Sequence, residues 1–158
     1  MNVFIRTAIC GLALLLAGCS ADMTITKEYN RADTNTFWPV IEIADTTYVQ
    51  HHVVDKMMAS IRKELDKREL LATDESTEHN KIVITITAYS MRNNTARVLA
   101  GAFAGSDKII TDVSVKNSMS NEILAAFSIE SETGSAWSSE IELINEHMEE
   151  IVDYLTSS

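Results

Sequence analysis

Three stretches in the second half of the chain alternate apolar and polar residues with a period of two: residues 82–89, 109–116 and 123–129. This period places every second side chain on one face, the pattern of a strand with one buried face. A sheet of such strands is stable only when another layer covers its apolar face. The residues predicted to form that face are Ile82, Ile84, Ile86, Ala88, Ile109, Val113, Val115, Ile123, Ala125, Phe127 and Ile129.

A first amphipathic segment can supply part of the cover. Apolar residues recur at steps of four from Val49 to Leu65, with polar residues mostly on the opposite side. This spacing predicts a helix over residues 47–70. Thr47 and Gln50 have the spacing of a capping box, which would start the helix at Thr47.

A second amphipathic helix is predicted near the C-terminus, after a capping box at Ser139 and Glu142. Residues 40–44 form a short β-type run ahead of the first helix. The element order is then β-α-β-β-β-α. It predicts one α+β domain over residues 37–158, a two-layer sandwich whose largely antiparallel sheet carries both helices on one face.

The N-terminus has the organisation of a secretory signal. Arg6 supplies the positive charge, and residues 7–16 form an apolar run that is too short to span a bilayer comfortably. The run ends in Leu-Ala-Gly-Cys, which resembles the lipobox of bacterial lipoproteins. The resemblance implies that residues 1–18 are a signal peptide, cleaved between Gly18 and Cys19, and that Cys19 is acylated.

Acylation at Cys19 would anchor the chain stably, because two or more acyl chains hold a protein on a membrane where one does so only marginally. Ser20 follows Cys19 in place of Asp. By the sorting rule of enteric-type lipoproteins this implies the outer membrane, and the periplasmic face is the default expectation. Residues 19–36 would comprise the lipidated cysteine and a polar tether, with a short strand over residues 23–29 as the alternative.

Charge and cysteine content narrow the class of protein further. The formal net charge is −10, so a nucleic-acid partner is not expected. Contact through a basic patch on anionic lipid is excluded for the same reason. Of the two cysteines, Cys10 would leave with the signal and Cys19 would be lipidated. The mature domain would therefore have neither a disulfide nor a thiol nucleophile.

The sequence carries no G-x-S-x-G or H-E-x-x-H motif, and we expect neither enzymatic activity nor a cofactor. His51 and His52 lie about 100° apart on a helix, so with Asp55 they would chelate a metal poorly, and we expect no metal site. His79 and His147 carry no ligand spacing. The aromatic side chains that could stack on sugars, or equally belong to the core, are Trp38, Tyr89 and Trp137.

The most unusual segment covers residues 97–105, a run of small and apolar residues after Arg97. Its glycines do not match a phosphate-binding loop. Two interpretations remain open: an oligomer or partner contact through Arg97, Gly101, Phe103 and Gly105, or a connection that folds back on its own core. The acidic face of the last helix likewise favours either a docking surface or plain solvation.

A family resemblance adds to these patterns. Arg92 and Arg97 precede the stretch from Gly101 to Gly105, and an alternating strand, a turn, a second strand ending near Glu132, a glycine-containing loop and an amphipathic helix follow. Over roughly residues 37–157 this resembles bacterial lipoprotein domains of the domain of unknown function 4410 family. The resemblance implies a fold and a location, because no activity is assigned to the family.

These expectations combine into one functional hypothesis. The chain would be a lipid-anchored envelope lipoprotein that acts without enzymatic activity, as a structural or adaptor component of an envelope complex. It would bind the membrane through its lipid and an envelope protein through its surface, and it could form homo-oligomers. The alternative is a periplasmic binding module for a glycan, a lipid or a small molecule.

Overall fold

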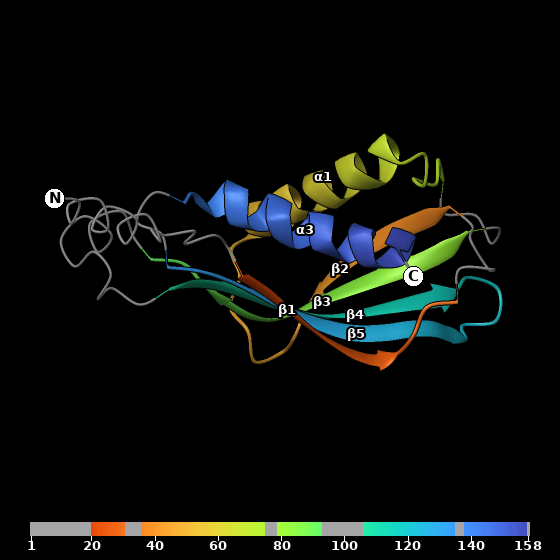
Figure 1. The fold of residues 1–158 in the computed structure, drawn as a ribbon, viewed down its shortest axis with the longest axis horizontal. Coiled ribbons are helices and arrows are strands. Elements are labelled where there is room, and N and C mark those ends of the chain that lie inside the picture. The colour runs from red at the N-terminus through yellow and green to blue at the C-terminus, as the bar shows by residue number, and fades with distance from the viewer. Residues whose placement is uncertain (1–19, 31–35, 75–78, 93–105, 135–137, 158) are drawn as a thin grey trace, which may run out of the picture.

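The computed structural model describes residues 20–30, 36–74, 79–92, 106–134 and 138–157. In this part of the chain five strands form one sheet, and two helices cover one of its faces (Figure 1). This arrangement confirms the predicted α+β sandwich with a largely antiparallel sheet. The elements are β1 (Ser20–Lys27), β2 (Phe37–Ile43), α1 (His51–Lys67), β3 (Asn80–Ser90), β4 (Asp107–Asn117), β5 (Ile123–Thr133) and α3 (Glu140–Ser157).

The strand order across the sheet is β1-β5-β4-β3-β2. Only β2 and β3 are parallel, because α1 connects them as a crossover, and the other neighbours are antiparallel. The sandwich therefore has two distinct ends. We call the proximal end the one at which the chain enters β1, and the distal end the one with the β4–β5 turn. Ser20, Ser90, Asp107 and Thr133 lie at the proximal end, and residues 118–122 lie at the distal end.

The first strand corrects the predicted tether. Ser20–Lys27 pairs along β5, from Ser20 opposite Glu132 to Lys27 opposite Ala126, so these residues form an edge of the sheet. The short strand that the sequence offered as an alternative is what forms, three residues earlier than expected. Its polar residues concealed it because an edge strand has little apolar surface to bury.

The two helices differ in how they start. At α3 the predicted capping box is confirmed: the Ser139 amide donates to Glu142 Oε2 at 2.7 Å, and the Glu142 amide donates to Ser139 Oγ at 3.3 Å. At α1 the capping box is wrong. The helix begins at His51 after Gln50, and Thr47 Oγ1 instead donates to the carbonyl of Thr87 at 2.7 Å, which ties the preceding loop to β3.

The core lies between the helices and the sheet, as the alternating patterns predicted for β4 and for most of β5. Ile123 was predicted to share this face but is 44% exposed, because the register shifts where β5 begins opposite Lys116. One residue of β3 departs from its prediction. A β-bulge between Ile86 and Ala88 shifts the register, so that Tyr89 pairs with the buried Ile109 and Ala88 pairs with the half-buried Ile110. Tyr89 therefore takes the helix-covered face that Ala88 was predicted to share.

Ile84 tests the assignment of the buried face. It is fully buried in β3, and its replacement by Ala should lower the free energy of unfolding by about 2–5 kcal/mol, because a cavity opens in a packed core. Ile123, at the start of β5, is 44% exposed and offers a matched control, so that Ile123→Ala should cost about 0.5 kcal/mol or less. Urea denaturation of both variants measures the difference, and equal losses would contradict the assignment.

Candidate functional site

The proximal end brings together polar side chains that are far apart in the sequence. Glu140, in the first turn of α3, is the common partner. Its Oε1 accepts a hydrogen bond from Lys56 Nζ at 3.1 Å and lies 3.7 Å from His52 Nε2 on α1. The Tyr89 hydroxyl also hydrogen-bonds to Glu140. One carboxylate thus joins the first turns of both helices to the end of β3.

The environment of Tyr89 reflects this arrangement. Partial burial raises the pKa of its phenol, and the negative charge of Glu140 and the hydrogen bond to that carboxylate raise it further. The phenol therefore stays protonated and serves as a hydrogen-bond donor. It reaches Glu140 because the bulge at Ile86 turns its side chain toward the helices.

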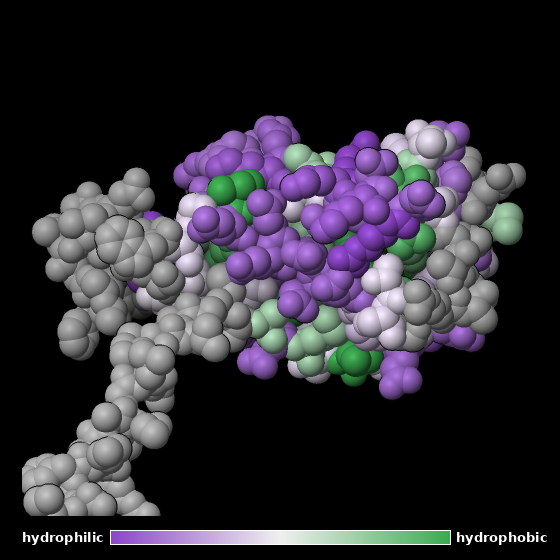
Figure 2. Space-filling model, turned by 45° about the horizontal axis from the view of Figure 1, so that its top comes forward, coloured by the Kyte–Doolittle hydropathy of each residue, from purple (hydrophilic) through white to green (hydrophobic). Residues whose placement is uncertain are grey.

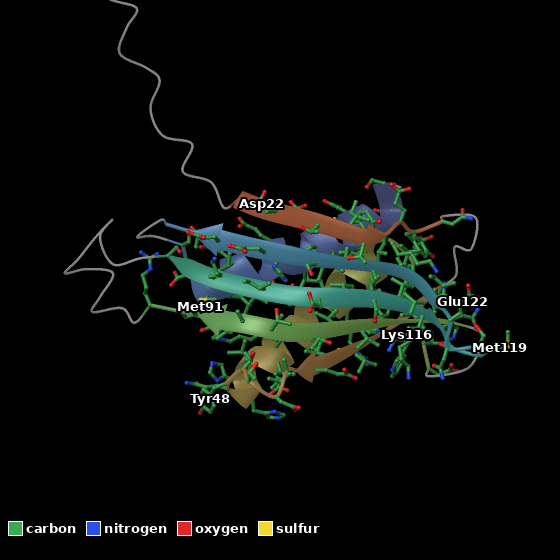
Figure 3. The ribbon with its side chains drawn as sticks, turned by 90° about the horizontal axis from the view of Figure 1, so that it is seen from below. Asp22, Tyr48, Met91, Lys116, Met119 and Glu122 are labelled. Atoms are coloured by element: carbon green, nitrogen blue, oxygen red, sulfur yellow. The ribbon has the colours of Figure 1, made fainter. Side chains whose placement is uncertain are left out.

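His52, Tyr89 and Glu140 line an open cavity of about 400 Å³ between the β2–α1 loop, the end of β3 and the start of α3. Tyr48, Val53 and Met91 contribute its apolar and aromatic wall, and Tyr48 is 84% exposed. Gln50, His52 and Glu140 contribute hydrogen-bonding groups. Such a mixture of one aromatic face with amide, imidazole and carboxylate groups can hold a small polar ligand. Figure 3 shows Tyr48 and Met91 toward the same end of the sheet.

A buried ion pair lies next to this cavity. Arg92, just after β3, and Asp107, the first residue of β4, are both nearly inaccessible to solvent. The Arg92 Nε donates to Asp107 Oδ1 at 3.2 Å, and one Nη donates to Oδ2 at 3.3 Å and to the Thr133 carbonyl at 3.3 Å. The pair links β3, β4 and β5 at the proximal end, and breaking such a pair typically costs about 3–5 kcal/mol.

A buried histidine is another polar group of the core. His147, on α3, lies against the sheet with no exposed surface. Its Nε2 lies 2.9 Å from Thr111 Oγ1 and its Nδ1 lies 2.7 Å from Ser131 Oγ. A neutral imidazole has one donor and one acceptor, which two adaptable hydroxyls can satisfy. Burial lowers the pKa of His147 to about 4, so the ring is neutral and structural at pH 7.

The histidines predicted to be poor metal ligands lie at separate places. His51 is exposed and pairs with Asp55 at 3.8 Å, while His52 faces Glu140. His79 lies near Asp74 and Thr36, and His147 is in the core. Within the described residues, no group of three or more His, Cys, Asp or Glu side chains could hold a metal ion.

Several predicted residues fall outside the described residues: Gly18, Cys19, Arg97, Gly101, Phe103, Gly105 and Trp137. Of the remaining aromatic candidates, Trp38 has the Arg62 guanidinium 4.9 Å above its ring, and this cation–π contact covers one face of the ring. Tyr89 is the aromatic candidate that does reach the cavity.

Some acidic side chains of α3 form ion pairs with basic side chains of α1 and of the residue after it. Asp153 forms an ion pair with Arg68, and Glu149 lies 4.0 Å from Lys67. Hydrophilic side chains dominate the helix-covered side of the molecule in Figure 2. This surface therefore includes charge pairs that hold the helices together as well as solvated carboxylates.

Among the described residues, neither α1 nor α3 has the apolar length needed to cross a bilayer.

One motif escaped the sequence analysis. Ser60 and Lys63 have the Ser-x-x-Lys spacing found in some serine hydrolases. Ser60 is 6% exposed, and its hydroxyl donates to Asn145 Oδ1 at 2.8 Å between the two helices. The hydroxyl therefore joins α1 to α3 and is not presented to a substrate.

Comparison with known proteins establishes the family. The sequence matches the model of a domain of unknown function (DUF4410) over residues 22–136, which is more than half of the chain, and the protein belongs to that family. The match begins within β1, in agreement with the first strand being part of the domain. Among curated proteins, none matches this chain.

Solved structures share the fold. A PelC dodecamer from Paraburkholderia phytofirmans has a TM-score of 0.56 at 9% identity, over 87% of this chain and 97% of that chain. A PelC variant dodecamer gives the same TM-score at 10% identity with the same coverage. A DUF4136 family protein from Bacteroides thetaiotaomicron has a TM-score of 0.51 at 14% identity, over 89% and 98% of the two chains. Identities this low show a common fold and no more.

The buried imidazole predicts how stability depends on pH. The pKa of His147 is about 4 in the folded protein and 6.5 in an ordinary environment, so the unfolded chain binds more protons between these values. Stability should therefore be complete above pH 6.5 and fall as the pH falls toward 4. At pH 5 this group alone should remove on the order of 2 kcal/mol.

Urea denaturation at pH 7.5 and pH 5 tests this dependence. His147→Gln retains an amide that can reach the two hydroxyls but lacks the titration, so its loss of stability between the two pH values should be smaller than that of the unmodified protein. His51→Gln, at an exposed histidine, serves as the control and should behave as the unmodified protein does. Equal losses in all three proteins would contradict the role assigned to His147.

Proposed function

We propose that this protein is a lipid-anchored envelope lipoprotein whose domain acts as a non-enzymatic structural or adaptor component of an envelope complex. The observation that carries the proposal is the position of β1. The lipobox-like sequence ends at Cys19, and the sheet begins at Ser20. An acyl group on Cys19 would thus be joined directly to the edge of a folded domain.

This direct connection favours a role in assembly. A lipid anchor confines the domain to two dimensions and raises its effective concentration for other membrane proteins. Because β1 follows Cys19 without a spacer, the domain would stay close to the membrane surface and present its far surfaces to partners. Two acyl chains or more would make this placement stable.

Self-association is one form that such an assembly can take. The PelC structures that share this fold are dodecamers, and we propose that the chain can associate with copies of itself. The described domain has two edge strands, β1 and β2, and the start of β2 is covered on its outer side where Phe37 bonds to Leu70 and Ala72. Edge strands of this kind are common sites of association between copies.

Crosslinking in living bacteria tests the adaptor role. We expect the full-length protein to capture an envelope protein, or a second copy of itself, in a constant ratio, and Cys19→Ala to lose both this capture and the membrane fraction. Cys10→Ala, within the expected signal peptide, is the matched control and should preserve both. Mass spectrometry identifies the captured chains. An acylated protein that is abundant in the outer membrane and captures nothing would contradict the adaptor role.

The cavity at the proximal end supports a second candidate, a binding module for a small polar ligand or glycan. It combines the exposed Tyr48 ring with Gln50, His52 and Glu140, which is a suitable set for a hydroxyl-rich molecule. A cationic ligand is not favoured, because Lys56 and His52 already lie beside Glu140, the carboxylate of the cavity.

Titration with an N-acetylglucosamine trimer, followed by amide NMR, tests this second candidate. Binding should shift the amide signals of Val53, Ser90 and Met91, which line the cavity, and Glu140→Gln should weaken it about tenfold through the loss of a charged hydrogen-bond acceptor. Glu146→Gln, on an exposed part of the same helix, should leave the shifts unchanged. Shifts spread over the whole domain, or none, would refute a site in the cavity for this ligand class.

A further inference from the structure

The direction of β1 relates the expected anchor to one end of the domain. Ser20 pairs with Glu132 near the end of β5, so the chain enters the sheet at the proximal end. Adjacent Cα atoms are about 3.8 Å apart, and an acyl group on Cys19 would therefore lie within one residue of that end. The membrane would then face the proximal end, and the β4–β5 turn would point away from it.

Three exposed apolar side chains at or toward the proximal end form the second observation, with Ile43 set back from it because Ile43 pairs with Ile86, four residues before Ser90. Ile43 ends β2, Tyr48 lies in the loop before α1, and Ile141 lies in the first turn of α3. Their exposed fractions are 41%, 84% and 42%. Figure 3 shows the labelled Tyr48 at the end opposite to Met119 and Glu122. These three residues are absent from the core and leave apolar surface in contact with solvent.

Their positions around the end are as informative as their exposure. The anchor would lie at the β1 edge of the sheet. Ile43 ends the opposite edge strand β2, Tyr48 lies in the loop after it, and Ile141 lies in the helix layer. Four strand spacings separate the two edges, roughly 19 Å. The anchor, the pair Ile43 and Tyr48, and Ile141 therefore lie at three separate places that are not in line. A flat membrane surface that touches all three would fix the tilt of the domain.

The chemistry of this end fits a lipid interface. Tyrosine has an apolar ring and a polar hydroxyl, and such side chains accumulate at the boundary between headgroups and acyl chains. The protein has a net charge of −10, and Asp45 and Glu142 are exposed near this end, so attraction to anionic lipid is not available. Contact through apolar side chains on a zwitterionic surface is the mode that these residues allow.

We propose that the proximal end is a membrane-contacting surface, in which Ile43, Tyr48 and Ile141 enter the lipid interface and hold the domain upright beside its anchor. This inference rests on the proposed lipidation of Cys19. It adds an orientation, because an anchor alone would leave the domain free to tilt. It also leaves the distal end, with Met119, facing away from the membrane.

Spin labels at single cysteines test the orientation. Cys10 would be removed with the signal and the thiol of Cys19 would be consumed by lipidation, so an introduced cysteine would be the only free thiol. The variants are Tyr48→Cys and Ile141→Cys at the proximal end, and Met119→Cys at the distal end. Met119 is 74% exposed and therefore matches Tyr48 in solvent access.

Each acylated full-length variant is placed in phosphatidylcholine nanodiscs, and label collisions with oxygen and with a water-soluble nickel chelate are measured. Labels at positions 48 and 141 should collide severalfold more with oxygen and less with nickel than the label at position 119. The label at position 141 reports with Tyr48 intact, so it controls for the loss of that ring. Equal, water-like accessibility at all three positions would overturn the proposal, and so would shielding at position 119 alone.

The mass of each purified variant separates the two ideas. If the protein carries acyl chains and position 48 stays in water, the orientation is wrong and the anchor stands. If the protein carries no acyl chain and leaves the nanodisc fraction, the anchor and the orientation both fail.

Discussion

The packing of two helices on a single face of the sheet is the constraint on which the rest of the structure depends. The helices bury Ile84, Ile129 and Met148 completely, while the opposite face of the sheet carries groups such as Asp112 and Ser128, which hydrogen-bond to each other. Every central strand must therefore alternate in a fixed register. Where the register shifts, at the bulge after Ile86, a residue of different chemistry enters the helix-covered face.

Within the described residues, three polar clusters lie in or beside that buried face, and each is held by hydrogen bonds or ion pairs. His147 lies between two hydroxyl groups, and Arg92 lies against Asp107 and the Thr133 carbonyl. Glu140 contacts both Lys56 and Tyr89. Two of these three clusters lie at the proximal end. There they fix the ends of β3 and β5, the start of β4 and the first turns of both helices, which gives the cavity rigid walls.

Much of this fold could be predicted from the sequence, because period and capping are local signals. The alternation in β4 and β5 and the capping box at Ser139 required no knowledge of the fold. The strand at Ser20–Lys27 was offered only as an alternative to a tether, because an edge strand buries too little to show a strong pattern. The start of α1 was misplaced because the Thr47 hydroxyl bonds to a strand forty residues away, which no local pattern records.

The candidate site was less accessible to sequence reasoning. Tyr89 was noticed as a ring that could stack on sugars and His52 as a poor metal ligand, while Glu140 was only part of the acidic face of the last helix. Their convergence depends on helix packing across more than eighty residues and on the bulge that turns Tyr89. The segment from Arg97 to Gly105 lies outside the described residues, so its role as a contact stays a prediction.

Direct attachment of a lipid to the first strand is the central claim of this account. The anchor would determine which end of the domain meets the membrane. The fold would then determine which surfaces face away from the membrane, toward partner proteins. Intact-mass spectrometry of the protein purified from bacterial membranes tests the attachment most directly. The account predicts a chain that begins at Cys19 and carries the added mass of a diacylglycerol group and an amide-linked acyl chain. A chain that retains residues 1–18, or one cleaved elsewhere without added lipid, would contradict it.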